Sequence, residues 1–277
     1  MKKAKICIIL LVSILGCKSE SRNAPTNIIT TDIQNFWTAY DKVTSTKDTL
    51  EQEKYLKEFF IDKGTSGLKA MMDARGYSVK EYLHAINYYP KFWKSIRQNT
   101  LGAEKYNKEL QTAIVKLGQI YPKLKPAKIY FTVGALRSGG TTMDSLVLIG
   151  SELAFGNKET PTEEFPKNLS HLRAYFDNGP SDNFIFLNTH EYVHTQQKTT
   201  IGETLLSQTL IEGTAEFVAS KVLQKESPNP QITFGGENDS AIKAEFSKEM
   251  FSPFLNNWIW NSPDNKFGMR DLGYYVG

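Results

Sequence analysis

The sequence predicts an α+β fold, in which a helical N-terminal region is followed by a small mixed sheet and then by further helices. Apolar residues recur at helical spacing over residues 31–121, and two compact β-branched and aromatic runs follow at residues 128–133 and 145–150. Helical periodicity returns from about residue 183. Strands that are grouped between helices, rather than alternating with them, are typical of this class.

Residues 1–16 have the pattern of a secretion signal. Three lysines precede an apolar stretch that is too short to span a bilayer as a helix, because about 20 residues are needed. The stretch ends in Ile-Leu-Gly-Cys17, which resembles a bacterial lipobox. That resemblance implies cleavage before Cys17 and a diacylglycerol on its sulfur, which would anchor the mature chain to a membrane. An ordinary cleaved signal peptide is the alternative.

The mature chain has balanced charge and no usable thiol. The leader contains three of the 33 basic residues and none of the 30 acidic ones, so 30 of each remain. This balance gives no argument for nucleic acid or for an acidic partner, and we expect neither. The only cysteines are Cys7 and Cys17, at or before the end of the leader. Any metal site in the mature chain must therefore use histidines and carboxylates.

The polar residues 17–30 are expected to form a flexible tether, and residues 31–125 a helical region. Ser78 and Glu81 have the spacing of a capping box, which predicts the start of a helix. Pro90 is expected to break or kink that helix. The many aromatic side chains of this region are expected to pack in the core, because they recur at helical spacing.

His190, Glu191 and His194 form an HExxH motif on the first helix after the sheet. Residues i and i+4 share one face of a helix, so both imidazoles can point at one ion while Glu191 reaches a water beside it. The neighbouring side chains are uncharged, as a buried metal-binding helix requires. Alternatively, the two histidines are polar residues of an ordinary helix, and Glu191 is a solvated surface carboxylate.

A catalytic zinc site needs three protein ligands and one open position. Glu212, eighteen residues after His194 in a segment of helical periodicity, is assigned as the third ligand of one zinc ion per chain. Glu216 is one helical turn later, and we expect it to hydrogen-bond the far nitrogen of a ligand histidine. The two glutamates could exchange these roles, or Glu216 could face water.

An HExxH motif followed by Glu-x-x-x-Glu on a second helix resembles the gluzincin clan of metallopeptidases. More narrowly, HEYVHTQQ and EGTAEF resemble predicted secreted zinc-dependent proteases and the related gliding-motility-type lipoproteins of Bacteroidetes. The resemblance implies a thermolysin-like metallopeptidase lobe over residues 126–277, with a substrate strand along a sheet edge that we expect at residues 145–155. Residues 270–277 resemble the start of a further helix in these relatives, so we expect the C-terminus to be truncated.

The motif predicts a zinc metallopeptidase that acts on peptide or protein substrates. Glu191 would be the general base and then the general acid. The developing oxyanion also needs a donor, for which Tyr274, Tyr275, Arg270 and His171 are the candidates. No acidic clamp for a free amino terminus is evident, which favours an endopeptidase.

The alternative function belongs to a different class. The chain could be a non-catalytic envelope lipoprotein that retains the peptidase fold for assembly or for binding a partner, as the gliding-motility relatives suggest. In both cases we expect a lipid-anchored protein of the bacterial envelope. Lys18 after the predicted lipidation site favours the outer membrane over the inner one.

Overall fold

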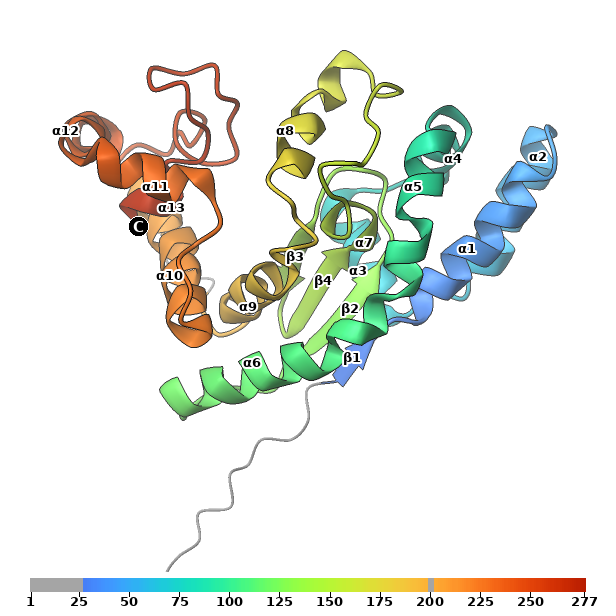
Figure 1. Ribbon diagram of the computed structural model, residues 1–277, viewed down its shortest axis with the longest axis horizontal. Helices are drawn as coiled ribbons and strands as arrows, with labels where there is room; N and C mark the ends of the chain where they lie inside the picture. The colour runs from blue at the N-terminus through green and yellow to red at the C-terminus, as the bar shows by residue number, and fades with distance from the viewer. Residues whose placement is uncertain (1–26, 199–201) are drawn as a thin grey trace, which may run out of the picture.

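Helices pack around a small mixed sheet in the computed structural model, which describes residues 27–198 and 202–277 (Figure 1). The architecture is α+β, as the sequence predicts. The predicted signal peptide at residues 1–16 and the predicted lipidation site Cys17 lie outside the described residues. Among the described helices, none is both long enough and apolar enough to cross a membrane.

The N-terminal helices begin and end where local sequence signals place them. The Ser78 side chain accepts a hydrogen bond from the Glu81 backbone N–H, and the Glu81 carboxylate accepts one from the Ser78 N–H, so the capping box is formed. Pro90 starts a new helix after Tyr89, because proline is favourable at the first helical position. The elements are α1 (Thr31–Thr44), α2 (Thr49–Leu56), a π-helix (Lys57–Ile61), α3 (Ser66–Arg75), α4 (Val79–Tyr88), α5 (Pro90–Leu101), a 3-10 helix (Ala103–Tyr106) and α6 (Asn107–Ile120).

The sheet has the strand order β1-β2-β4-β3. The central strands β2 (Lys128–Thr132) and β4 (Leu146–Gly150) are parallel and almost fully buried, which explains their continuous apolar composition. On one side β1 (Asn27–Ile29) pairs parallel with β2, and on the other β3 (Gly140–Met143) pairs antiparallel with β4.

The outer strands correct two expectations. Residues 27–29 fall within the expected flexible tether at residues 17–30, yet they form β1, because Ile28 and Ile29 pack against the core. The expected edge strand at residues 145–155 is also wrong: β4 is central, and the edge next to the later helices is β3. Consecutive glycines such as Gly139 and Gly140 are typical of a turn, but the backbone from Gly140 to Met143 pairs with β4 and forms a strand.

The C-terminal half is helical, and it includes the helix that carries the HExxH motif. That helix is anchored to the sheet, because the Tyr192 hydroxyl accepts a hydrogen bond from the backbone N–H of Ala127, just before β2. The elements are α7 (Ser151–Ala154), a 3-10 helix (Lys167–Leu169), α8 (His171–Asp177), α9 (Phe184–His194), α10 (Leu205–Leu223), α11 (Pro230–Glu237), α12 (Asp239–Glu249) and α13 (Gly273–Val276).

Two clusters of buried apolar residues stabilise the described chain. The large core joins the N-terminal helices, the sheet and α9, so the expected regions 31–125 and 126–277 share it across their boundary. The small core lies on the C-terminal side and consists of six buried residues: Leu205, Ile242, Phe246, Trp258, Ile259 and Leu272. Helix α10 contributes to both, with Leu205 in the small core and Ala215 and Val222 in the large one.

Candidate metal centre and adjoining pocket

The two histidines of the HExxH motif lie on one face of α9. Their Nε2 atoms are 3.0 Å apart, as expected for side chains one helical turn apart that point in the same direction. Most of α9 is buried between the sheet and α10, and His190 itself is buried. The helix therefore presents its imidazoles to the protein interior and not to bulk water.

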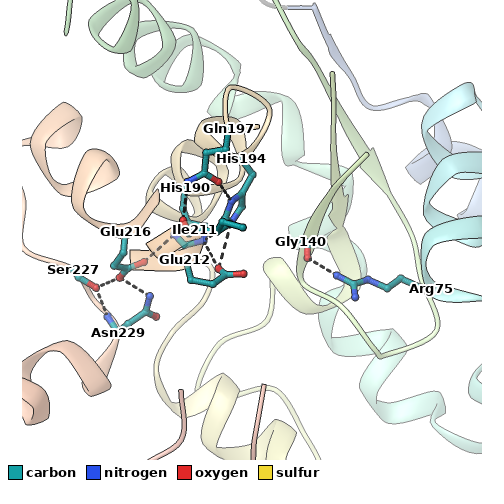
Figure 2. Close-up of polar contacts among 10 residues, drawn as sticks. All are labelled: Arg75, Gly140, His190, His194, Gln197, Ile211, Glu212, Glu216, Ser227 and Asn229. Atoms are coloured by element: carbon teal, nitrogen blue, oxygen red, sulfur yellow. Dashed lines mark hydrogen bonds and ion pairs between the residues drawn. The ribbon is translucent and has the colours of Figure 1, made fainter. Parts of the chain in front are cut away.

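Glu212 reaches the histidines from α10. Its Oε2 atom lies 3.4 Å from Nε2 of both His190 and His194 (Figure 2). A tetrahedral zinc ion with ligand distances near 2.1 Å separates its donor atoms by about 3.4 Å. The three side chains therefore have the donor types and the spacing that suit one zinc ion, and they leave a fourth position open.

The far nitrogens of both histidines face oxygen acceptors. His190 Nδ1 lies 2.9 Å from Glu216 Oε2, and His194 Nδ1 lies 2.7 Å from Gln197 Oε1. The Gln197 side-chain amide is itself fixed, because its Nε2 atom donates a hydrogen bond to the backbone carbonyl of Ile211 at 2.7 Å. A carboxylate or amide oxygen can only accept, so each Nδ1 carries a proton, and Nε2 is the nitrogen of each ring that would bind a metal ion.

Glu216 connects the centre to a turn after α10. While Oε2 bonds His190, Oε1 accepts hydrogen bonds from the Ser227 hydroxyl and from the Asn229 side-chain amide, the latter at 2.7 Å. The structure thus brings Glu212 to the ion-facing nitrogens and Glu216 to the far nitrogen of His190. Both carboxylates are buried, and neither faces water.

The charges around the centre favour a cation. Burial opposes ionisation of His190, but hydrogen bonds to Glu212 and Glu216 outweigh it and raise the pKa of His190 to about 10. Burial likewise opposes ionisation of the two glutamates, yet their contacts with the histidines hold the pKa of both carboxyls below the usual range. The two buried carboxylates remain anionic, so a positive charge between them is stabilised.

Glu191 lies between α9 and the edge strand β3. A Cβ atom on Gly140 would be 2.8 Å from Glu191 Oε1, so only glycine lets the carboxylate lie against the strand there. Burial raises the pKa of Glu191. On the other side of β3, Arg75 of α3 donates to the carbonyl oxygen of Gly140 at 3.4 Å (Figure 2). Its charge counteracts the rise in the Glu191 pKa.

A pocket of about 340 Å³ adjoins the centre. His190, Glu191 and Glu216 form part of its wall, so the pocket borders one of the three candidate ligands and the proposed base. Most of the remaining wall is apolar, as is typical of sites that hold a ligand side chain. The apolar lining comes from α8, from the turn before α9 and α9 itself, from the turn before α11 and the start of α11, and from the segment between α12 and α13: Ala174, Pro180, Phe186, Leu187, Pro228, Pro230 and Pro263.

Of the four candidates for the oxyanion donor, three line the pocket and one does not. Tyr274 lines the pocket, and its ring is stacked on that of His190 at 5.8 Å between centroids. Burial and the nearby Glu212 raise its pKa well above the ordinary value, so it keeps its proton as a donor. Arg270 and His171 also line the pocket. Tyr275 points elsewhere, because its hydroxyl donates to Asp239 at 2.7 Å.

Several residues of the site were not identified from the sequence. Gln197 lies three residues after His194, just beyond the end of α9, where its side chain can reach back to His194 Nδ1. This spacing could have predicted the contact. Ser227 and Asn229 lie in a Ser-Pro-Asn-Pro stretch that indicates only a turn. Arg75 lies 65 residues before Gly140 and gave no signal at all.

Comparison with known proteins identifies a family. The profile of the family described as gliding motility protein GldB matches residues 18–270. No curated protein and no solved structure matches the chain. The comparisons therefore give no support to the expected gluzincin clan or thermolysin-like lobe. Since the match covers nearly all of the chain after Cys17, this protein belongs to the gliding-motility lipoprotein family of the cell envelope.

Proposed function

We propose that this lipoprotein is a zinc-dependent metallopeptidase with one zinc ion held by His190, His194 and Glu212. The observation that carries the proposal is the arrangement of donors: three ligand atoms converge at the spacing of a zinc site, and both far nitrogens have acceptors. Acceptors on the far nitrogens are the arrangement that orients histidines which bind zinc.

The proposed reaction is hydrolysis of a peptide bond. When bound, zinc supplies a water of pKa near 7 and polarises the scissile carbonyl. Glu191 takes the proton from the attacking water and passes it to the departing amine. Its position suits this role, because Glu191 follows the ligand His190 directly on α9 and lines the pocket. The hydroxyl of Tyr274 would donate to the oxyanion.

The substrate would bind as an extended peptide along β3. This strand pairs with β4 on one side only, so its other edge can accept a further strand. The pocket beside Glu191 would receive one apolar side chain of that peptide. Apart from Glu191, the acidic residues of the pocket take part in ion pairs, Glu216 with His190 and Asp271 Oδ2 with Arg270. This arrangement favours an endopeptidase.

Zinc content is the first test. Full-length protein purified without chelator should contain about one zinc per chain by elemental mass spectrometry, and Glu212→Ala should lose it. Glu237→Ala, an exposed glutamate on α11, is the matched control and should retain the metal. Folded wild-type protein without zinc, after incubation with the metal, would overturn the proposal.

The family match favours a second candidate, a non-catalytic lipoprotein that acts in gliding motility through assembly or partner binding. The two candidates differ in whether Glu191 is required. The test is whether the variant Glu191→Gln restores a deletion phenotype that the wild-type gene restores. If the variant accumulates and binds zinc but does not restore it, hydrolysis is required. Full rescue by Glu191→Gln would establish the non-catalytic function.

A further inference from the structure

A basic surface lies at one end of the molecule. From residue 110 to residue 143 the sequence contains no aspartate or glutamate, although the mature chain as a whole has equal numbers of basic and acidic residues. Four lysines fall in this stretch: one on α6, two between α6 and β2, and one at the first position of β2. We call this surface the basic end and define it by Lys116, Ile120, Tyr121, Lys123, Lys125 and Lys128.

The side chains of the basic end are exposed and uncompensated. All four lysines are exposed, and within the described residues none of them forms an ion pair. Two large apolar side chains accompany them, since Ile120 is 55% and Tyr121 42% exposed. Ile120 follows Lys116 by one helical turn and therefore shares its face of α6. Cations around exposed apolar groups are typical of surfaces that contact lipid head groups.

The basic end lies where the chain enters the fold from its N-terminus. Asn27, the first described residue, pairs with Lys128 in the sheet. The nine residues 18–26 separate it from Cys17, so even a fully extended connection spans only about 30 Å. The loop before β2 is held in place, because Gln196 exchanges hydrogen bonds with the backbone of Lys125.

We propose that the basic end is a membrane-docking surface, which binds anionic phospholipid head groups of the bilayer that holds the lipid on Cys17. The short connection keeps the lysines near this bilayer at a high effective concentration. Each lysine close to an anionic surface strengthens binding by roughly fivefold. Ile120 and Tyr121 would enter the head-group layer, while the globular body stays outside the hydrocarbon region.

Docking would set the direction in which the candidate site faces. Figure 1 shows α6 and β1 at one end of the molecule, whereas α8, α11 and α12 lie at the other. The pocket is lined from α8 and α11, from residues near α13, and from the faces of α9 and α10 that carry His190 and Glu216. A chain docked through its basic end therefore holds the pocket away from the bilayer and toward the aqueous compartment.

The test uses the full-length lipoprotein, bound through its own lipid to vesicles of phosphatidylcholine alone or with phosphatidylglycerol. The mature chain has no cysteine apart from the lipidated Cys17. In the variant Ile120→Cys, a polar maleimide can therefore react only at position 120, and its rate measures how exposed the basic end is. Leu50→Cys on α2, 78% exposed, is the matched control. The parent protein without an added cysteine gives the background.

We expect phosphatidylglycerol to slow modification at position 120 by about tenfold or more and to leave position 50 unchanged. Replacing the four lysines with glutamine, or adding 0.5 M salt, should restore the rate at position 120. Equal rates at position 120 in both kinds of vesicle would overturn the proposal. Equal slowing at positions 50 and 120 would also overturn it, because the contact would then not be specific to the basic end.

Discussion

The large and the small core bury their apolar residues in different ways. The large core combines aromatic residues from the N-terminal helices with the sheet, and Trp37, Trp93 and Phe131 are all fully buried within it. The small core has only six buried residues and depends on a long irregular segment, residues 250–272. So small a cluster cannot offset the chain entropy of the C-terminal region by itself.

The candidate metal centre lies where the two cores meet. His190 and His194 come from α9, which the large core surrounds, and Glu212 comes from α10, which both cores share. Tyr274, beside His190, packs against the small core. The comparison predicts that the large core fixes the histidines, and that zinc, bound as proposed, would add to the stability of the small core.

The largest effect is expected at Glu191, which the large core presents to the centre. Glu191→Gln should lower kcat/KM on a peptide substrate by about 10²- to 10⁴-fold. Glutamine has nearly the same shape as glutamate but cannot act as the general base. Zinc content and thermal unfolding should stay as in the wild type. If the variant hydrolyses the peptide at the wild-type rate, the assignment of Glu191 as the base is wrong.

Paired tryptophan truncations compare the cores directly. Trp93→Ala should lower the free energy of unfolding of the whole chain by about 3–5 kcal/mol, because it leaves a cavity in the large core. Trp258→Ala should instead loosen the C-terminal region and leave the sheet protected. Hydrogen exchange resolved by segment would show this, and equal loss of protection in both regions would contradict the two-core description.

The small core is also expected to contribute to catalysis through Tyr274. Tyr274→Phe should lower kcat by about 10²-fold with little change in KM, because a donor to the oxyanion is removed. Tyr275→Phe is the control on the neighbouring residue, whose hydroxyl bonds Asp239, and it should keep the wild-type kcat. Equal kcat values for the two variants would remove Tyr274 from the proposed site.

Metal removal tests the dependence of the small core on the centre. At a zinc concentration 100 times the Kd, binding stabilises the folded protein by about 2.7 kcal/mol, so a chelator should lower the Tm. Segment-resolved hydrogen exchange should show the loss mainly in α10 and in residues 250–272. In Glu212→Ala the chelator should have no further effect on the Tm.

The smallest effect is expected for Glu216, which hydrogen-bonds the proposed zinc ligand His190. Glu216→Ala should weaken zinc binding by about 10- to 100-fold, because His190 loses the acceptor that orients it. Competition with a chelating dye would measure the affinity. Glu237→Ala should bind zinc as the wild type does, and a similar loss there would indicate a nonspecific effect of charge.

The sequence predicted the features that depend on local spacing. The HExxH helix, the capping box at Ser78 and the two central strands each follow from residues that are close together in the chain. The outer strands did not follow, because β1 has only three residues and its partner β2 lies about 100 residues later. The contribution of Arg75 to the site likewise depends on packing between distant segments, which periodicity does not report.

The carboxylate of Glu216 ties two parts of the molecule to one another. One oxygen holds His190, and the other holds Ser227 and Asn229, whose neighbours Pro228 and Pro230 form part of the pocket wall. A shift of His190 would therefore be transmitted to this wall through a single side chain. If zinc binding moves His190, the pocket wall should move with it, and the fluorescence of an apolar dye bound in the pocket would then change with zinc content.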